Sequence, residues 1–278
     1  MSNLLIHSMA EFADLIFAAL ERAGARHVVE IGAEFGGMSH LLADYVMATD
    51  GHLTSIDPTP SPNFAAWAAQ APVVTHIAQP SLAVIDTLAE VDAWIIDGDH
   101  NYYTVLHELQ AADRVSRRDG RPLLVFLHDV SWPTGRRDMY YAPERIPPAF
   151  RQAYTYGAGA MLDRVELVPG QGFRGETNWA MADRSGGPRN GVLTAVEDFI
   201  AEAGRDGRML AFANIPAVFG LGVVFDVDAE WSPDLAVLLA PFHDNRLLAS
   251  VELNRLRNYL KVIEWQDSSA RTAAMTSE

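Results

Sequence analysis

The feature that most constrains the fold is a regular alternation of short apolar runs and amphipathic helical patterns. The alternation occupies the first 130 residues, and its apolar runs cover residues 27–31, 52–56, 73–77, 92–97 and 122–128. Between them, apolar residues recur at the three- and four-residue spacing of a helix, for example at Met38, Leu42, Val46, Val105 and Leu109. Such alternation predicts βαβ units, right-handed crossovers and a mostly parallel sheet with helices on both faces.

The chain has 278 residues, enough for one domain with a substantial core. We expect a single doubly wound α/β domain over residues 1–265, beginning with an amphipathic helix at 5–23. Runs at 208–212 and 218–227 lie close together and predict an antiparallel hairpin at the sheet edge, which brings the sheet to seven strands. Residues 130–190, rich in Pro, Gly, Arg and Tyr, interrupt the alternation and predict a lid over the sheet.

The C-terminal part of the chain predicts a helix over 233–265, followed by a polar tail. Leu253, Leu256, Leu260 and Ile263 form one apolar stripe on this helix. We expect the stripe to pack on the domain, and a homodimer formed through it is the alternative. Residues 266–278 are polar and are expected to be disordered.

Composition excludes several function classes. The formal net charge of −15 argues against nucleic acid as a partner, because phosphate recognition needs a basic surface. The chain has no cysteine, which removes disulfides, thiolate metal sites and cysteine nucleophiles. No apolar run is long enough to span a membrane, and the N-terminus lacks the pattern of a signal peptide. We therefore expect a cytoplasmic protein whose partner is a small molecule.

A glycine turn follows the first apolar run. Gly32 and Gly36 permit a tight backbone turn, and the helix that follows offers unpaired N–H groups to a ligand. Asp57 ends the second run, where a carboxylate is well placed to accept hydrogen bonds from the hydroxyls of a bound ribose. These positions predict a nucleotide-like cofactor at the first strand.

The spacing of the glycines distinguishes between cofactors. A dinucleotide turn has the pattern G-x-G-x-x-G, whereas here three residues separate Gly32 from Gly36 and the middle glycine is missing. Glu34 within the turn would repel a pyrophosphate but would tolerate the cationic sulfonium of S-adenosylmethionine. At these residues the chain resembles the class I S-adenosylmethionine-dependent methyltransferases over about residues 25–130, with a further likeness in the terminal hairpin.

This resemblance implies a Rossmann-like methyltransferase fold and a set of cofactor-binding residues. Glu30, Gly32 and Gly36 match the first family motif, and Asp57 matches the ribose-binding acid. Gln79 and Ser81 are the nearest candidates for contacts with the adenine. The full set of cofactor-binding residues that we expect is Glu30, Gly32, Ala33, Gly36, Asp57, Gln79, Ser81 and Asp97.

Acidic and histidine side chains follow two further runs. Asp97, Asp99 and His100 come after the fourth, and His128 and Asp129 end the fifth. In the methyltransferase topology these strands are neighbours, so the side chains should meet at one edge of the sheet. Mutual repulsion there is relieved most simply by a divalent metal. The alternative is that Asp97 and Asp99 only cap the helix near residue 102.

The cluster is similar to that of metal-dependent O-methyltransferases acting on macrolide sugars and of their cephalosporin-hydroxylase-like relatives. The resemblance implies Asp97 and Asp129 as metal ligands and His100 as the base. Either His128 or Asp99 would complete a three-ligand site. His128 stands where that family has an acid, and we take it as the third ligand with Asp99 as the alternative. Imidazole is a poor ligand for Mg²⁺, so Mn²⁺ or Fe²⁺ becomes more plausible.

The start of the 130–190 segment carries candidate substrate-binding residues. Adjacent arginines and tyrosines are suited to hold an anionic or hydroxylated substrate or to stack on a ring. We expect the following residues to contact substrate: Asp99, Trp132, Arg136, Arg137, Tyr140 and Tyr141.

The sequence thus favours O-methylation of a hydroxylated small molecule, either a sugar or a specialised metabolite. Three alternatives remain. A metal-dependent hydroxylase-like enzyme would use the same His and Asp groups with iron, and a non-catalytic protein would bind S-adenosylmethionine only. A nicotinamide oxidoreductase is disfavoured by Glu34 and the missing middle glycine.

Overall fold

The alternation of strands and helices is present as predicted. A computed structural model describes residues 8–276 of the chain. The five parallel strands are β1 (His27–Ile31), β2 (His52–Ile56), β3 (Val74–Ile77), β4 (Ala93–Ile96) and β5 (Leu124–His128). The helices associated with them are α1 (Ala13–Ala23), α2 (Gly37–Ala48), α3 (Pro62–Ala68), α4 (Ser81–Val84), the 3-10 turn η2 (Ile85–Thr87) and α5 (Tyr102–Asp119).

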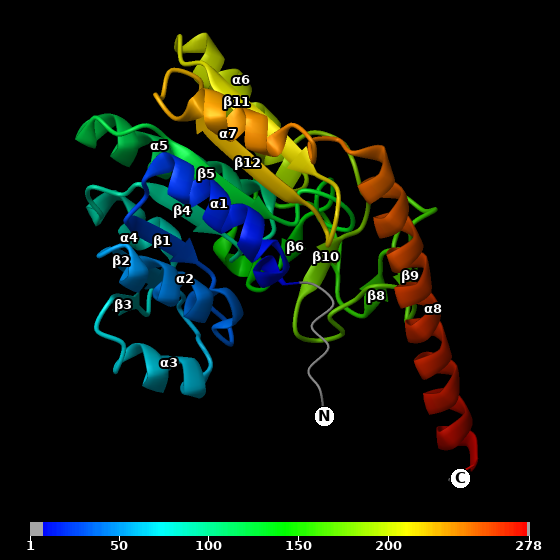
Figure 1. The fold of residues 1–278 in the computed structure, drawn as a ribbon. Helices are drawn as coiled ribbons and strands as arrows, with labels where there is room; N and C mark the ends of the chain where they lie inside the picture. Colours follow the sequence, from blue (N-terminus) through cyan, green and yellow to red (C-terminus); the bar gives the residue numbers. More distant parts are fainter. Residues whose placement is uncertain (1–7, 277–278) are drawn as a thin grey trace.

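The central sheet has seven strands in the order β11-β12-β5-β4-β1-β2-β3 (Figure 1). Helix α6 (Val192–Arg205) leads into β11 (Leu210–Ile215) and β12 (Leu221–Asp226). These two strands pair antiparallel with each other, and β12 pairs antiparallel with β5. The predicted terminal hairpin and mostly parallel, Rossmann-like methyltransferase sheet are therefore confirmed.

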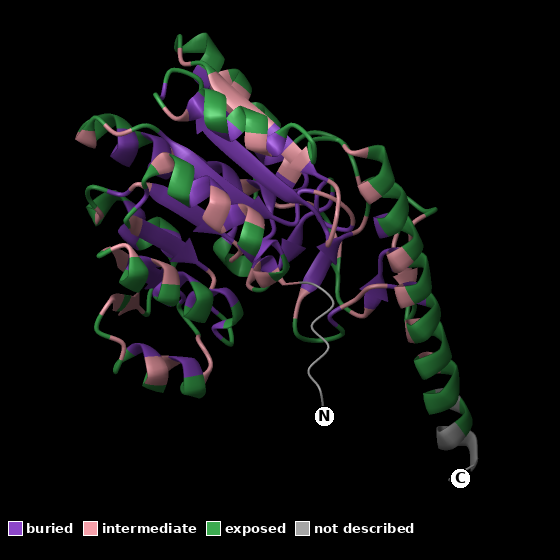
Figure 2. Cartoon of the chain, in the orientation of Figure 1, coloured by how far each residue is buried: buried purple, intermediate pink, exposed green. Residues whose placement is uncertain are grey.

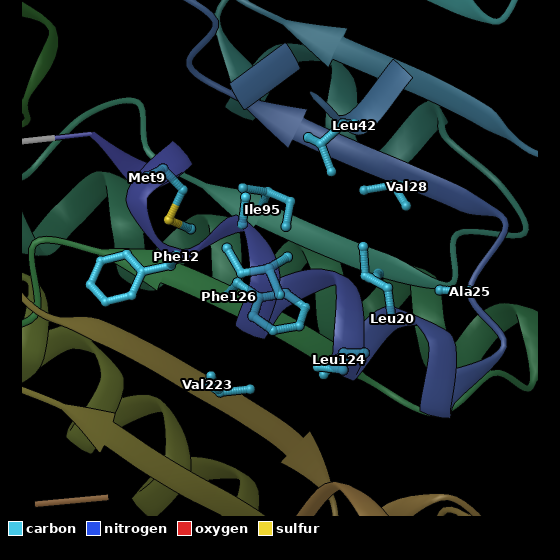
Figure 3. Packing of buried hydrophobic residues seen from close by; sticks show 14 of the residues in the cluster. Met9, Phe12, Leu20, Ala25, Val28, Leu42, Ile95, Leu124, Phe126 and Val223 are labelled. Carbon is cyan, nitrogen blue, oxygen red and sulfur yellow. The ribbon is translucent and has the colours of Figure 1, made fainter. Parts of the chain in front are cut away.

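Two apolar layers enclose the sheet, whose strands are largely buried (Figure 2). In one layer, Met9, Phe12 and Leu20 from the N-terminal helices pack on strand residues that include Ile95 and Phe126 (Figure 3). Helices α5 and α6 pack against each other and supply the opposite layer. Each fully buried large apolar side chain stabilises the fold by roughly 1.5–3 kcal/mol, so the two layers together hold the helices against the sheet.

The N-terminal helix is shorter than predicted. A 3-10 turn η1 (Met9–Phe12) precedes α1, and the Ser8 hydroxyl accepts a hydrogen bond from the Ala10 amide at 3.2 Å. Residues 5–7 of the predicted helix lie outside the described residues. Gly24, with φ of 62°, ends α1 in the left-handed conformation that favours glycine.

The 130–190 segment forms small sheets beside the main one. Strands β6 and β7 flank β10 in a three-stranded sheet, and β8 pairs with β9. Figure 1 shows this segment between the sheet and the last helix. Its elements are β6 (Met139–Tyr140), the 3-10 turn η3 (Pro143–Arg145), β7 (Tyr154–Thr155), β8 (Ala158–Gly159), β9 (Val168–Pro169) and β10 (Ala180–Ala182).

The C-terminal region differs from the prediction in two respects. The expected single helix over 233–265 is two helices, α7 (Ser232–Leu239) and α8 (Arg246–Thr276). The Asn245 side chain accepts hydrogen bonds from the amides of Leu247 and Leu248 at 2.9 and 3.1 Å, which starts α8 as a new helix.

The polar segment that we expected to be disordered continues α8 as far as Thr276, and residues 277–278 lie outside the described part. Asp267 of this segment binds Arg174 of the insertion with N–O distances of 2.7 and 3.1 Å. Such pairing stabilises helix where composition alone indicates disorder. Within residues 8–276, none of the helices combines the length and apolarity needed to cross a bilayer.

Candidate active site

The glycine turn between β1 and α2 is built against the end of β4. Gly32 has φ of 94°, and a Cβ placed there would collide with the Asp97 carbonyl oxygen. Gly36, with φ of 83°, occupies the N-cap of α2, and its amide donates to the Ala33 carbonyl at 2.6 Å. Both glycines are therefore required by backbone geometry, and the turn opens the N-terminus of α2 toward the end of the sheet.

Asp57 holds the glycine turn in place. One of its carboxylate oxygens accepts the amides of Ala33 and Glu34 at 3.0 and 2.8 Å, and the other accepts the Thr59 amide at 2.8 Å. Glu34 adopts φ of 47°, a left-handed conformation that such contacts help to hold. Asp57 thus lies directly beside the turn, and its role toward a ribose stays a prediction.

Glu30 lies beneath the turn and is buried. Its Oε2 accepts hydrogen bonds from the hydroxyls of Ser39 and Ser55 at 2.6 and 2.9 Å, so it joins β1 to α2 and β2. Burial, opposed by these two hydrogen bonds, raises the pKa of Glu30 to about 7. These contacts give Glu30 a structural task, since it supports the turn from below.

The two residues predicted to contact adenine differ in environment. Gln79 is exposed, whereas Ser81 is buried at the start of α4 and donates to Glu108 at 2.5 Å. Burial raises the pKa of Glu108 to about 8. Ser81 is therefore held by its hydrogen bond to Glu108 of α5. The adenine contacts of Gln79 and Ser81 stay predictions.

Acidic and histidine groups converge at the ends of β4 and β5, as the sequence predicts. One ligand atom from each of Asp97, His100 and Asp129 lies within 4.8 Å of the other two. The nearest ring nitrogen of His100, Nδ1, is 3.3 Å from Asp129 Oδ2. Since carboxylate and imidazole groups at this separation can bind one cation, the donor set fits a divalent metal.

His128 belongs to the same cluster and has a defined orientation. Its Nδ1 lies 3.2 Å from Asp97 Oδ1 and 3.1 Å from Asp129 Oδ2, while Nε2 lies 2.9 Å from the Val218 carbonyl oxygen. A carbonyl only accepts, so Nε2 carries a proton and Nδ1 faces the two carboxylates. Burial alone would lower the pKa of His128, but the charges of Asp97 and Asp129 raise it well above its usual value.

Asp129 is held in a strained backbone conformation at the end of β5. Its φ is 62°, which is uncommon for a residue other than glycine. The Thr134 hydroxyl donates to both the carbonyl and Oδ1 of Asp129 at 3.2 Å. Burial would raise the pKa of Asp129, yet the neighbouring His100 and His128 hold it below its usual range. The Asp129 carboxylate thus stays ionised between two imidazoles.

Some of the predicted substrate-binding residues lie near this cluster. Tyr141 is 52% exposed, and its ring centroid is 6.2 Å from that of His100. Asp99 accepts from the Thr104 hydroxyl at 3.3 Å, and burial raises its pKa. Trp132 packs beside Phe173 and Phe219 with centroid separations of 6.0 and 6.2 Å. Tyr141 and Asp99 therefore flank the cluster, whereas Trp132 belongs to an aromatic group around the insertion.

Other predicted substrate-binding residues have partners elsewhere. Arg136 pairs with Glu197 of α6, with two N–O distances of 2.6 Å. Arg137 is buried and donates to the carbonyls of Val165 and Ala182, and burial lowers its pKa to about 10. The Tyr140 hydroxyl donates to Asp138 at 2.7 Å. Arg136 ties the insertion to α6, whereas Arg137 and Tyr140 bond within the insertion, and the structure does not bring these three side chains to the cluster.

Sequence reasoning missed the groups that support the cluster. Thr134 contacts Asp129, and the Val218 carbonyl fixes His128, although neither residue belongs to a motif. Asp138 is a buried junction whose Oδ1 accepts the amides of Tyr102 and Gly191, each at 2.7 Å. A backbone carbonyl or a loop hydroxyl leaves no sequence signal. Asp138 lies next to Arg137 in the segment that we expected to contact substrate, and its buried position did not show in the sequence.

Comparison with known proteins agrees with this fold. Residues 29–130 match the sequence model of a family described as a methyltransferase domain. This range contains the glycine turn, Asp57 and the whole cluster at β4 and β5. Residues 29–130 are therefore similar to a methyltransferase domain, and the strand order of the sheet is that of a Rossmann-like methyltransferase fold. A search of curated proteins finds no match.

Solved structures with a distant likeness include two methyltransferases. The O-methyltransferase TomG of Streptomyces achromogenes, solved with S-adenosylmethionine, is 17% identical, and the match covers 80% of this chain and 82% of TomG with a TM-score of 0.46. The methyltransferase PaMTH1 of Podospora anserina, solved with S-adenosylhomocysteine, is 16% identical over 78% of each chain, also with a TM-score of 0.46. These similarities are too low to assign a substrate.

Proposed function

We propose that the chain is an S-adenosylmethionine-dependent O-methyltransferase that acts on a hydroxylated small molecule and requires a divalent metal. The observation that carries this proposal is the convergence of Asp97, His100 and Asp129 within 4.8 Å at the strand ends next to the glycine turn. A methyl donor bound at the turn would place its sulfonium beside a cluster able to bind the oxygen of an acceptor.

The donor would be bound by the glycine turn and the residues around it. Gly32, Ala33 and Gly36 offer close backbone approach, and Asp57 lies against the turn where a ribose would bind. Glu34 lies close enough to Asp97 and Asp57 that these two carboxylates, together with burial, raise its pKa, and a cation bound at the turn would relieve this repulsion. This environment favours a cationic sulfonium over a pyrophosphate. Gln79 and Ser81 remain the proposed adenine contacts.

The metal would be bound by Asp97, His128 and Asp129. His128 would serve through Nδ1, since its Nε2 is engaged by Val218 and its Nδ1 lies within 3.2 Å of both carboxylates; the proton that the raised pKa keeps on the imidazole would leave as the metal binds. When bound, a divalent cation would lower the pKa of an acceptor hydroxyl. Imidazole in the donor set favours Mn²⁺ or Fe²⁺ over Mg²⁺. Asp99 and Tyr141 flank the cluster and are the proposed substrate contacts.

His100 would remove the proton of the acceptor hydroxyl. It is buried, lies 3.3 Å from Asp129, and has the exposed Tyr141 ring near its own. Asp129 would orient the imidazole and stabilise the imidazolium that forms. The acceptor oxygen would then attack the sulfonium methyl in line, and S-adenosylhomocysteine would leave. Because His100 also lies within ligand distance, a role as metal ligand in place of His128 is the competing assignment.

Two variants separate these roles. His100→Ala should abolish methyl transfer, measured with S-adenosylmethionine carrying a labelled methyl group and a panel of hydroxylated acceptors, while Mn²⁺ binding persists. His128→Ala should weaken Mn²⁺ binding by about tenfold or more. Loss of Mn²⁺ binding in His100→Ala would assign His100 as a ligand. Turnover that survives both variants and a metal chelator would refute the proposal.

A metal-dependent hydroxylase is the second candidate, favoured by one observation. Two imidazoles, those of His100 and His128, lie 3.3 and 3.1 Å from the same Asp129 oxygen, and two histidines with a carboxylate suit iron. Oxygen consumption by the iron-loaded protein, without methyl transfer, would support this candidate over the first.

A further inference from the structure

Helix α8 is connected to the cluster by hydrogen bonds through the turn between β11 and β12. Glu252 of α8 is buried, and its Oε1 accepts the Phe219 amide at 3.0 Å. Arg255, one turn further along α8, binds both oxygens of Glu252 at 2.7 Å and places its guanidinium 5.0 Å from the centre of the Phe219 ring. A buried, doubly bonded carboxylate of this kind is fixed in one position.

The turn that Glu252 contacts is strained. Val218, Phe219 and Gly220 join β11 to β12, and their φ values are 44°, 63° and 95°. The first two side chains are bulky, and bulky residues rarely adopt left-handed conformations. At Gly220 a Cβ would lie 2.7 Å from the Ser131 amide nitrogen. Such a conformation persists only where the surroundings hold it, and the Phe219 amide bonded to Glu252 is one of the holding points.

The same turn accepts hydrogen bonds from residues on either side of Asp129 in the chain. The Val218 carbonyl accepts from His128 Nε2 at 2.9 Å, and the Phe219 carbonyl accepts from the Ser131 amide at 2.7 Å. His128 precedes Asp129, and Ser131 follows it by two positions. The turn therefore links α8 to the segment that carries two groups of the cluster.

We propose that the Glu252–Arg255 pair positions His128. By holding the Phe219 amide, the pair keeps the Val218 carbonyl against His128 Nε2, and so keeps Nδ1 facing Asp97 and Asp129. Glu252 touches no reacting atom and acts through the turn as a positioning residue. The consequence for metal affinity rests on the proposed function, whereas the orientation of His128 does not.

The orientation can be measured without metal. We would label the nine histidines with ¹⁵N and record the exchange of the His128 Nε2 proton at fixed pH, with the signal assigned by its absence in His128→Gln. Wild type should show a protected proton. In Glu252→Ala and in Arg255→Met the proton should exchange about tenfold faster or more, because a turn that is less firmly held opens more often and exposes the proton to water. Glu252→Gln keeps an acceptor for the Phe219 amide and should restore protection.

A matched control lies on the same helix. Glu264 is exposed and pairs with Lys261 at 2.5 Å, so Glu264→Gln changes charge on α8 without reaching the turn and should leave the exchange unchanged. Folding of each variant is checked by circular dichroism, and Arg255→Met decides the question if Glu252→Ala does not fold. Unchanged exchange in either folded variant would overturn the proposal.

Mn²⁺ titration of the same proteins provides a second readout. Affinity should fall about tenfold in Glu252→Ala and recover in Glu252→Gln. If wild type binds no Mn²⁺ while the exchange still depends on Glu252, the proposed metal site fails and the positioning role stands. If wild type binds Mn²⁺ and the exchange is independent of Glu252, the positioning role fails alone.

Discussion

The Asp97 carbonyl occupies the space where a side chain on residue 32 would have to lie. The Asp97 amide in turn donates to the Ile31 carbonyl at 2.9 Å, which extends the ladder between β1 and β4 by one bond. The glycine turn and the acidic cluster are thus in direct backbone contact. A cofactor at the turn and a metal at the cluster would share one rigid platform.

This contact makes Gly32 far more sensitive to substitution than a left-handed glycine that faces open space. Gly32→Ala combines an unfavourable φ with a backbone collision, and we expect it to lower the free energy of unfolding by about 3 kcal/mol. Gly24→Ala is the matched control, because Gly24 has φ of 62° with nothing within 4 Å of the added Cβ. It should cost only about 1 kcal/mol. Urea unfolding measures both, and equal losses would contradict the role of the Asp97 carbonyl.

The two adjacent arginines of the insertion should contribute unequally to stability. Arg137→Met would leave the carbonyls of Val165 and Ala182 without their buried donor, at a cost of about 2–4 kcal/mol. Arg136→Met removes an exposed pair with Glu197 and should cost less than about 1 kcal/mol. Thermal unfolding compares them. Two variants of equal stability would show that the hydrogen bonds of Arg137 do not hold the insertion together.

Buried carboxyl groups should make stability fall as the pH rises. Burial raises the pKa of Glu108 to about 8, from an ordinary value of 4.5, so the native state retains a proton that the unfolded state has lost between these values. Glu108 therefore favours folding at low pH, and this contribution disappears as the pH approaches 8. Glu30, with a pKa raised to about 7, acts in the same direction.

Glu108→Gln should abolish its share of this pH dependence. The free energy of unfolding of wild type should fall by about 2 kcal/mol more than that of the variant when the pH is raised from 6 to 8.5, because a neutral amide does not ionise. Urea unfolding at the two pH values gives the difference, with Glu264→Gln as an exposed control. A constant offset between Glu108→Gln and wild type at both pH values would refute the shifted pKa.

The central sheet and the cluster were predictable because local pattern and topology determine them. The five apolar runs and the predicted hairpin place the strand ends within two or three residues of those observed. Parallel neighbouring strands then bring Asp97 and Asp129 to the same edge of the sheet. The glycine positions were readable for a related reason, since Gly32 and Gly36 meet backbone constraints that no other residue satisfies.

The insertion and the C-terminal helices were less predictable because long-range contacts determine them. Arg137 is predicted from sequence to contact substrate, whereas in the structure it donates to two carbonyls that lie 28 and 45 residues away in the chain. The polar end of α8 indicates disorder until Asp267 meets Arg174, 93 residues earlier. Glu252 carried no signal at all, because its partner is a backbone amide on a strained turn. A homodimer through α8 remains a prediction.

Calorimetry tests the central claim most directly. S-adenosylmethionine, NADH and Mn²⁺ would each be titrated into wild type and into Asp129→Asn, which removes one metal-binding carboxylate while keeping its shape. We predict that S-adenosylmethionine binds both proteins, that NADH binds neither, and that Mn²⁺ binds wild type about tenfold or more tightly than the variant. Binding of NADH in place of S-adenosylmethionine, or equal Mn²⁺ affinity in both proteins, would contradict the account.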